Sequence, residues 1–131
     1  MQIRNGDTMV YVIDDDTSVQ RAMLRLMRSA GMKSSAFSSV DEFLAVDISA
    51  TDACVVADVH MSGIDPLELP SLLESKGTSL PIIFITANDT PETRSRVRIA
   101  GAAGYFRKPV DGQALIDLIH WALSEQSQPS N

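Results

Sequence analysis

The sequence predicts an α/β domain in which a doubly wound five-stranded parallel sheet lies between two layers of helices, a (βα)5 three-layer sandwich. Two observations predict this fold class. The apolar runs Met9–Ile13, Ala53–Ala57 and Pro81–Ile85 are short and rich in β-branched residues, which is typical of strands buried on both faces. Segments with a helical period alternate with the strands, and this alternation favours parallel pairing with right-handed crossovers.

Length and composition limit the class of protein. The 131 residues suffice for one compact domain, and the net charge of −6 argues against direct binding to nucleic acid or to anionic membranes. The single cysteine, Cys54, excludes an internal disulfide, and its apolar neighbours favour a small buried side chain over a reactive thiol. No apolar run approaches the roughly 18 residues that span a bilayer, and no signal peptide is evident. We therefore expect a cytoplasmic, single-domain protein.

The first two strands each lead into a helix. Residues 1–8 are polar and aperiodic and are expected to form a flexible arm before the strand Met9–Ile13. From about Thr17 to Ala30 the apolar residues recur with a helical period, and Gly31 ends that helix. Asp16 is interpreted as a solvated residue that leads into the helix N-cap, and not as a metal ligand. A short second strand is expected at Lys33–Phe37.

The middle of the chain carries clear helix signals. Ser39 and Glu42 form a capping box that opens a helix through about Val46, and a loop at residues 48–52 precedes the third strand. Another helix is predicted from Pro66 to Lys76.

The fourth helix begins at Thr90 and Pro91 and runs to about Ala100. Its apolar face is thin, essentially Val97, Ile99 and Ala100, and the arginines beside it can be a solvated face only. A weakly anchored helix is also one that a switch could move.

The last strand, Gly104–Arg107, is followed by a helix that begins near Asp111. We place the folded domain at residues 9–124. Residues 125–131 have the Ser, Gln and Pro content of a tail or linker.

Polar side chains stand at the carboxyl ends of four strands. Asp14 and Asp15 follow the first strand, Asp58 ends the third, Thr86 ends the fourth and Lys108 follows the fifth. In a parallel sheet these ends lie at one edge, where ligands usually bind, and we expect Asp58 to be held rigidly and open to solvent. Clustered carboxylates favour a hard cation such as Mg²⁺, because no His or Cys cluster accompanies them. A carboxylate beside that cation can accept a phosphoryl group.

These residues resemble the response-regulator receiver domains of two-component signalling. The resemblance covers about Met9 to Ser124, and it is specific because four motifs occur in order. Within the family, the chain is most similar to receivers that precede LuxR-type DNA-binding domains. It implies the flavodoxin-like receiver fold. The motifs are Val-Tyr-Val-Ile with Asp14, Asp15 and Asp16; Asp58-Val-His-Met61; Phe84-Ile-Thr86-Ala87; and Gly104-Tyr105-Phe-Arg-Lys108-Pro109.

The resemblance implies a role for each matching residue. Asp58 corresponds to the phosphoacceptor, Asp15 to the direct Mg²⁺ ligand and Asp14 to the acid that holds the metal through water. The backbone carbonyl of His60 corresponds to a third protein ligand. Thr86 corresponds to the switch hydroxyl, and Tyr105 corresponds to the aromatic residue that rotates with the switch. Lys108 corresponds to the phosphoryl-binding ammonium, which precedes a cis proline bond.

The implied function is a phosphorylation-dependent switch. A histidine kinase would phosphorylate Asp58, and the face formed by the fourth helix, fifth strand and fifth helix would then dimerise or bind a partner. The chain would be a phosphoacceptor that assists its own phosphotransfer and dephosphorylation, and not an ordinary enzyme. A C-terminal effector domain absent from this sequence is compatible with its end, and so is a stand-alone receiver.

Two other functions remain open. A phosphatase with an aspartate nucleophile usually has a second Asp two residues later, where this chain has His60. A binding-only relative of receivers would need to have lost an acid, the Thr or the Lys, and none is lost. The loop after Asp58 departs from the family, with Ser62 for the usual proline and Pro66 for a glycine. His60 and Asn88 would flank the phosphoryl group and influence its lifetime.

Overall fold

The computed structural model describes residues 8–48 and 52–127, in which a single sheet is flanked by helices. The strands are β1 (Thr8–Ile13), β2 (Lys33–Phe37), β3 (Asp52–Asp58), β4 (Ile82–Thr86) and β5 (Gly104–Arg107). The helices are α1 (Thr17–Ser29), α2 (Val40–Leu44), α3 (Leu69–Ser75), α4 (Pro91–Ile99) and α5 (Gly112–Ser127), and a 3-10 helix, η2, spans Pro66–Glu68.

The sheet is parallel throughout, with the strand order β2-β1-β3-β4-β5. The predicted doubly wound fold is therefore confirmed. β1, β3 and β4 are the interior strands, with Val12 of β1 paired to Val56 of β3 and Asp58 of β3 paired to Ile85 of β4. Because every strand runs in the same direction, the residues that follow β1, β3, β4 and β5 reach the same edge of the sheet.

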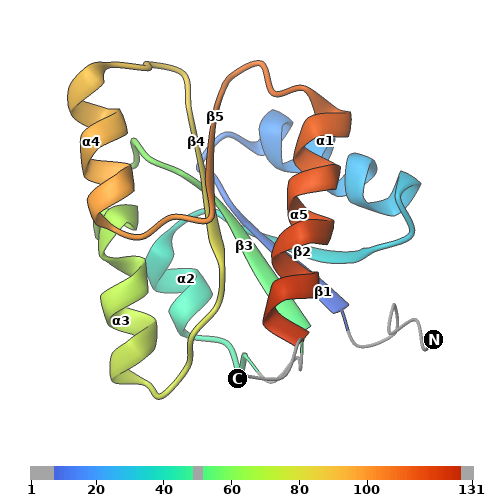
Figure 1. Cartoon of the computed structure of the whole chain (residues 1–131), viewed down its shortest axis with the longest axis horizontal. Coiled ribbons are helices and arrows are strands. Elements are labelled where there is room, and N and C mark those ends of the chain that lie inside the picture. The colour runs from blue at the N-terminus through green and yellow to red at the C-terminus, as the bar shows by residue number, and fades with distance from the viewer. Residues whose placement is uncertain (1–7, 49–51, 128–131) are drawn as a thin grey trace.

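Two hydrophobic cores lie on opposite faces of the sheet. Val10 and Val12 of β1 pack with residues of α1 and α5, whereas Tyr11 and Ile13 pack with residues of α2, α3 and α4. Figure 1 shows this division, with α1 and α5 on one side of the sheet and α2, α3 and α4 on the other. Strands buried on both faces need apolar residues at successive positions, which explains why the strand sequences are continuous apolar runs.

The segment predicted as one helix from Pro66 to Lys76 is divided in the structure. A 3-10 turn over Pro66–Glu68 precedes α3, which begins at Leu69. Pro70 lies in the first turn of α3 and has no N–H to donate to the carbonyl of Pro66, so an α-helical turn cannot form at that point.

The predicted inner face of α4 is wrong at one position. Val97 is buried and its partner on the inward face is Thr93, one turn earlier, while Ile99 is 82% exposed. Residues two apart lie on nearly opposite sides of a helix, so Val97 and Ile99 cannot both face the sheet. α4 therefore has an even narrower apolar contact than its sequence indicates.

The boundaries of the domain also differ from those predicted. Thr8 and Asp52, expected in the arm and in a loop, are paired to each other at the start of β1 and β3. α5 continues to Ser127, beyond the predicted end at residue 124. The rest of the predicted arm, loop and tail, residues 1–7, 49–51 and 128–131, lies outside the described residues. Within residues 8–48 and 52–127, no helix combines the length and apolar character needed to cross a bilayer.

Candidate phosphoacceptor and metal site

Three carboxylates come together where β1 and β3 end. Asp14 follows β1 and is fully buried, Asp15 beside it is exposed, and Asp58 is the last residue of β3. One ligand oxygen from each of the three lies within 4.8 Å of the others. The adjacency of β1 and β3 in the sheet produces this cluster from residues that are more than forty positions apart.

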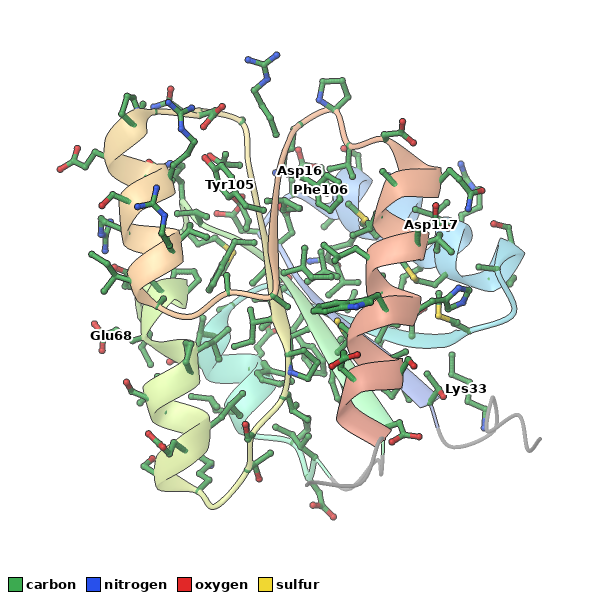
Figure 2. The ribbon with its side chains drawn as sticks, in the orientation of Figure 1. Asp16, Lys33, Glu68, Tyr105, Phe106 and Asp117 are labelled. Atoms are coloured by element: carbon green, nitrogen blue, oxygen red, sulfur yellow. The ribbon has the colours of Figure 1, made fainter. Side chains whose placement is uncertain are left out.

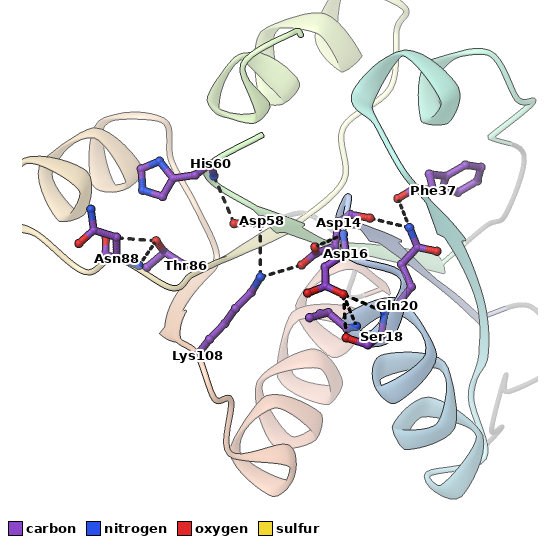
Figure 3. A network of polar contacts seen from close by, with 11 residues as sticks. Asp14, Asp16, Ser18, Gln20, Phe37, Asp58, His60, Thr86, Asn88 and Lys108 are labelled. Carbon is purple, nitrogen blue, oxygen red and sulfur yellow. Dashed lines mark hydrogen bonds and ion pairs between the residues drawn. The ribbon is translucent and has the colours of Figure 1, made fainter. Parts of the chain in front are cut away.

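Lys108 connects two of these carboxylates. Its ammonium donates to Asp14 Oδ2 at 2.9 Å and to Asp58 Oδ2 at 3.3 Å (Figure 3). The lysine reaches the site because its backbone N–H donates to the carbonyl of Thr86, which extends the pairing of β4 and β5 by one residue. The Lys108–Pro109 peptide bond is cis.

Asp58 is not open to solvent, contrary to the sequence-based expectation, since only 7% of the residue is exposed. Lys108 contacts Oδ2, and the backbone N–H of His60 donates to Oδ1 at 3.2 Å. Both carboxylate oxygens are therefore hydrogen-bonded. Lys108, which follows the distant strand β5, covers the aspartate. This contact cannot be recognised from the sequence of the third strand alone.

Burial and pairing act in opposite directions on the charges of the site. Burial raises the pKa of Asp14, although hydrogen bonds from the Asp16 N–H and from Lys108 lower it in part. Burial alone would lower the pKa of Lys108, but its hydrogen bond to Asp14 and the charges of Asp14 and Asp58 outweigh that effect, and the net pKa is raised. The folded protein thus favours a charged lysine and disfavours a charged Asp14.

The donor set fits a hard divalent cation. Three carboxylates and one ammonium leave an excess of negative charge at the site, and oxygen is the ligand atom that Mg²⁺ prefers. Asp14, Asp15 and Asp58 are the residues that would hold the ion.

Asp16, by contrast, belongs to α1 and not to the cluster. It is itself the N-cap, and not a residue leading into it: Oδ1 accepts from Ser18 N at 2.9 Å, Ser18 Oγ at 2.7 Å and Val19 N at 3.4 Å. These hydrogen bonds to Ser18, followed by that to Val19, lower the pKa of Asp16. Figure 3 shows Asp16 beside Ser18.

Thr86 is completely buried at the end of β4. Its hydroxyl accepts from Asn88 N at 3.0 Å and donates to Asn88 O at 3.2 Å. The hydroxyl is thus bonded to Asn88 in the loop that follows β4, and not to Asp58.

Tyr105 lies on β5, on the face covered by α4, while Phe106 points to the face of α5 (Figure 2). The Tyr105 hydroxyl donates to Asp89 Oδ1 at 2.9 Å. Burial and this bond to Asp89 raise the pKa of Tyr105 to about 12. The tyrosine is thus attached to the loop after β4, which also contains Asn88, the partner of Thr86.

Comparison with known proteins decides the family. A model of the response regulator receiver domain matches residues 10–120. The chain belongs to this receiver family. It is 36% identical over 115 residues to the transcriptional regulatory protein TdiR of Thauera aromatica, a match that covers 88% of this chain and 51% of TdiR.

Solved structures agree with this assignment. A receiver protein from Burkholderia phymatum is 41% identical, with a TM-score of 0.75 over 89% of this chain and 95% of that one. The response regulator StyR is 34% identical, with a TM-score of 0.82 over 92% of this chain and 61% of StyR. The chain thus spans about half the length of TdiR and less than two thirds of StyR.

Receivers are the phosphorylation-dependent signalling domains of two-component systems. Receivers bind Mg²⁺ at an acidic pocket, and in this chain Asp14, Asp15 and Asp58 form an acidic cluster at the corresponding edge of the sheet. Membership of the family also implies a kinase partner.

Two polar residues around this receiver site were not predicted from the sequence. Gln20 of α1 hydrogen-bonds the Asp14 carbonyl, and Asp89 accepts from both Tyr105 and Arg94. Each is an ordinary polar residue in a helix turn or loop, and no spacing rule distinguishes it from its solvated neighbours. Only the position of its partner in the fold shows what it does.

Proposed function

We propose that this receiver accepts a phosphoryl group on Asp58 from a histidine kinase, with Mg²⁺ held by Asp14, Asp15 and Asp58. The backbone carbonyl of His60 is proposed as a further ligand, on the family resemblance. One observation carries the proposal: Asp58 Oδ2 lies 3.3 Å from the Lys108 ammonium, and Asp58 shares a 4.8 Å cluster with Asp14 and Asp15. Nucleophile, counterion and cation ligands therefore meet at one point.

The transfer follows from this arrangement. An Asp58 carboxylate oxygen attacks phosphorus, the bond from phosphorus to the donor imidazole nitrogen breaks, and its electron pair remains on that nitrogen. When bound, Mg²⁺ supplies positive charge that lowers the repulsion between the carboxylates and the phosphoryl oxygens. Lys108, already within bonding distance of Asp58, can move its ammonium to a phosphoryl oxygen.

The same geometry supports a switch. Thr86 would exchange its bonds to Asn88 for a bond to the phosphoryl group, which would shift the loop that also holds Asp89. Tyr105 is bonded to Asp89 and would change position with it. The surface of α4, β5 and α5 would then differ between the two states and would serve for dimerisation, for partner binding or for contact with an effector domain.

The test is phosphorylation by a small phosphoryl donor such as acetyl phosphate in the presence of Mg²⁺, followed by intact-mass measurement. We expect wild type to gain one acid-labile phosphoryl group and Asp58→Asn to gain none. Asp16→Asn is the matched control, because it changes an aspartate outside the cluster and asparagine is an equally good N-cap. Equal labelling of wild type and Asp58→Asn would refute the assignment.

A further inference from the structure

Gln20 makes an unusual set of contacts for a residue in the first turn of a helix. Its side-chain amide donates to the backbone carbonyl of Asp14, to Phe37 O at 3.3 Å and to Ser38 Oγ at 3.1 Å. Figure 3 shows Gln20 between Phe37 and the acidic residues. One half-buried amide therefore joins α1 to the carboxyl ends of both β1 and β2.

These contacts lie just beyond the last paired residues of the two strands. The β1–β2 register ends at Ile13 and Phe37, and the Asp14 N–H still donates to Phe37 O at 3.0 Å. The chain then leaves the sheet, and the Asp14 carbonyl receives its hydrogen bond from Gln20. The glutamine takes the place of a strand neighbour and fixes the peptide plane between Asp14 and Asp15.

Asp15 depends on that peptide more than Asp14 does. The Asp14 carboxylate is held by Lys108 at 2.9 Å and by the Asp16 N–H at 2.9 Å. The exposed Asp15 side chain forms no hydrogen bond or ion pair with any of the described residues, 8–48 and 52–127. No partner among these residues fixes this carboxylate, so the backbone of Asp15 sets which positions the carboxylate can reach.

We propose that Gln20 is a positioning residue for the cation site. It does not touch the ion, but by holding the Asp14 carbonyl it orients the following residue, Asp15, toward Asp14 and Asp58. The inference rests on the proposed function, since it presumes that these three carboxylates bind Mg²⁺. Residues that hydrogen-bond and orient the ligands of a metal ion contribute to metal affinity, although they do not contact the ion themselves.

The experiment measures metal affinity directly, without phosphorylation. Mn²⁺, which prefers the same oxygen ligands, is titrated into the whole chain, the free ion is followed by its electron paramagnetic resonance signal, and Mg²⁺ is used to displace it. Gln20→Met keeps the length of the side chain and removes its donors, and we expect it to weaken binding about tenfold. Gln113→Ala is the control, because Gln113 donates to Asp117 on α5, away from the site. It should bind within twofold of wild type.

Gln20→Glu separates positioning from charge. It adds a negative charge near the cluster, which by Coulomb attraction alone would tighten cation binding. A carboxylate cannot donate to the Asp14 carbonyl, so the positioning role predicts weaker binding instead. Tighter or unchanged binding in Gln20→Glu, together with unchanged binding in Gln20→Met, would overturn the inference.

Two further outcomes are distinguishable. If Gln20→Met lowers the stability of the metal-free protein but its folded form binds Mn²⁺ as wild type does, the glutamine is only structural and the inference fails. If wild type binds no metal, or if Asp15→Asn binds as tightly as wild type, the cation site itself fails and the proposed function fails with it.

Discussion

Arg96 on α4 donates to Asp65 in the loop after β3 at 2.7 Å, and the same aspartate accepts from the Leu67 N–H at 3.0 Å as the N-cap of η2. A second arginine, Arg94, donates to Asp89 in the loop after β4 at 2.8 Å. The two loops that flank Asp58 are thus both bonded to arginines of α4. These arginines are therefore part of the attachment of α4 and not only a solvated face.

Arg96→Gln should loosen α4 with little change in global stability. The pair with Asp65 is exposed, so its loss should cost less than about 1 kcal/mol. Because α4 buries only Thr93 and Val97, its backbone amides should nevertheless exchange with solvent deuterium several times faster. Hydrogen exchange followed by mass spectrometry measures this.

The matched control is Arg98→Gln, since Arg98 lies on the exposed side of α4 and forms no ion pair within the described residues. Its α4 amides should exchange as in wild type. Equal exchange in the two variants would mean that the Arg96–Asp65 pair does not hold the helix.

Asp89→Asn should lower the pKa of Tyr105 from its value of about 12, because the variant removes the carboxylate that accepts the phenolic proton and repels the phenolate. The chain has two tyrosines, so the titration is made in a Tyr11→Phe background. Ultraviolet absorbance at a fixed alkaline pH near 11 should report a larger ionised fraction in Asp89→Asn.

Arg94→Ala should shift the pKa of Tyr105 in the opposite direction. The positive charge of Arg94 lowers the pKa of Tyr105, so its removal should raise that pKa and reduce the ionised fraction. A shift in the same direction for both variants would show that the loop rearranges and that the tyrosine–aspartate bond does not set the pKa.

Asp14→Asn should stabilise the metal-free protein while abolishing metal binding. Because burial raises the pKa of Asp14, the folded protein binds a proton at this group more tightly than the unfolded chain does. The contribution of Asp14 to stability therefore falls as pH rises from the ordinary Asp value of 3.8 through the folded pKa. The neutral amide avoids this loss, and we expect a gain of about 1 kcal/mol at neutral pH.

Urea unfolding in the presence of a chelator, repeated between mildly acidic and neutral pH, checks this prediction. The difference in unfolding free energy between Asp14→Asn and wild type should grow as pH rises. A difference that stays constant with pH would mean that the charge of Asp14 is not the source of the effect.

Lys108→Met should destabilise the metal-free protein. The variant leaves Asp14 and Asp58 without their ammonium, and the partial exposure of Lys108 limits the expected cost to about 2 kcal/mol. The raised pKa of Lys108 means that its contribution is fully present below the ordinary value of 10.5 and is lost as pH rises through the folded pKa. Urea midpoints of the two proteins should therefore converge at strongly alkaline pH.

Millimolar Mg²⁺ should restore part of the lost stability of Lys108→Met, because a bound cation replaces the missing positive charge. Asp14→Asn is the negative control, since it lacks a ligand of the cluster and should gain nothing from Mg²⁺. Equal stabilisation of both variants would indicate a general salt effect.

Local signals predicted most elements because they act within a few residues. Ser39 accepts from the Glu42 N–H at 3.1 Å and begins α2, and Thr90 accepts from the Thr93 N–H at 3.0 Å and begins α4. The predictions that were wrong had both distant and local causes. The exposure of Asp58 was misjudged because Lys108 covers it, and Ile99 faces solvent because the single inward face of α4 is occupied by Thr93 and Val97.

The alternation of strands and helices can be predicted from the sequence alone, and so can the acids, the hydroxyl and the lysine at the strand ends. Periodicity, caps and turns are local properties, so they can be recognised without the fold. Which of these side chains contact one another depends on the packing of the whole fold. Lys108 bonds Asp14 and Asp58 across 94 and 50 positions of the chain, because the strand order brings the ends of β1, β3 and β5 to one edge of the sheet. The contacts of Gln20, Asp89 and Arg96 depend on the same packing, which no short stretch of sequence contains.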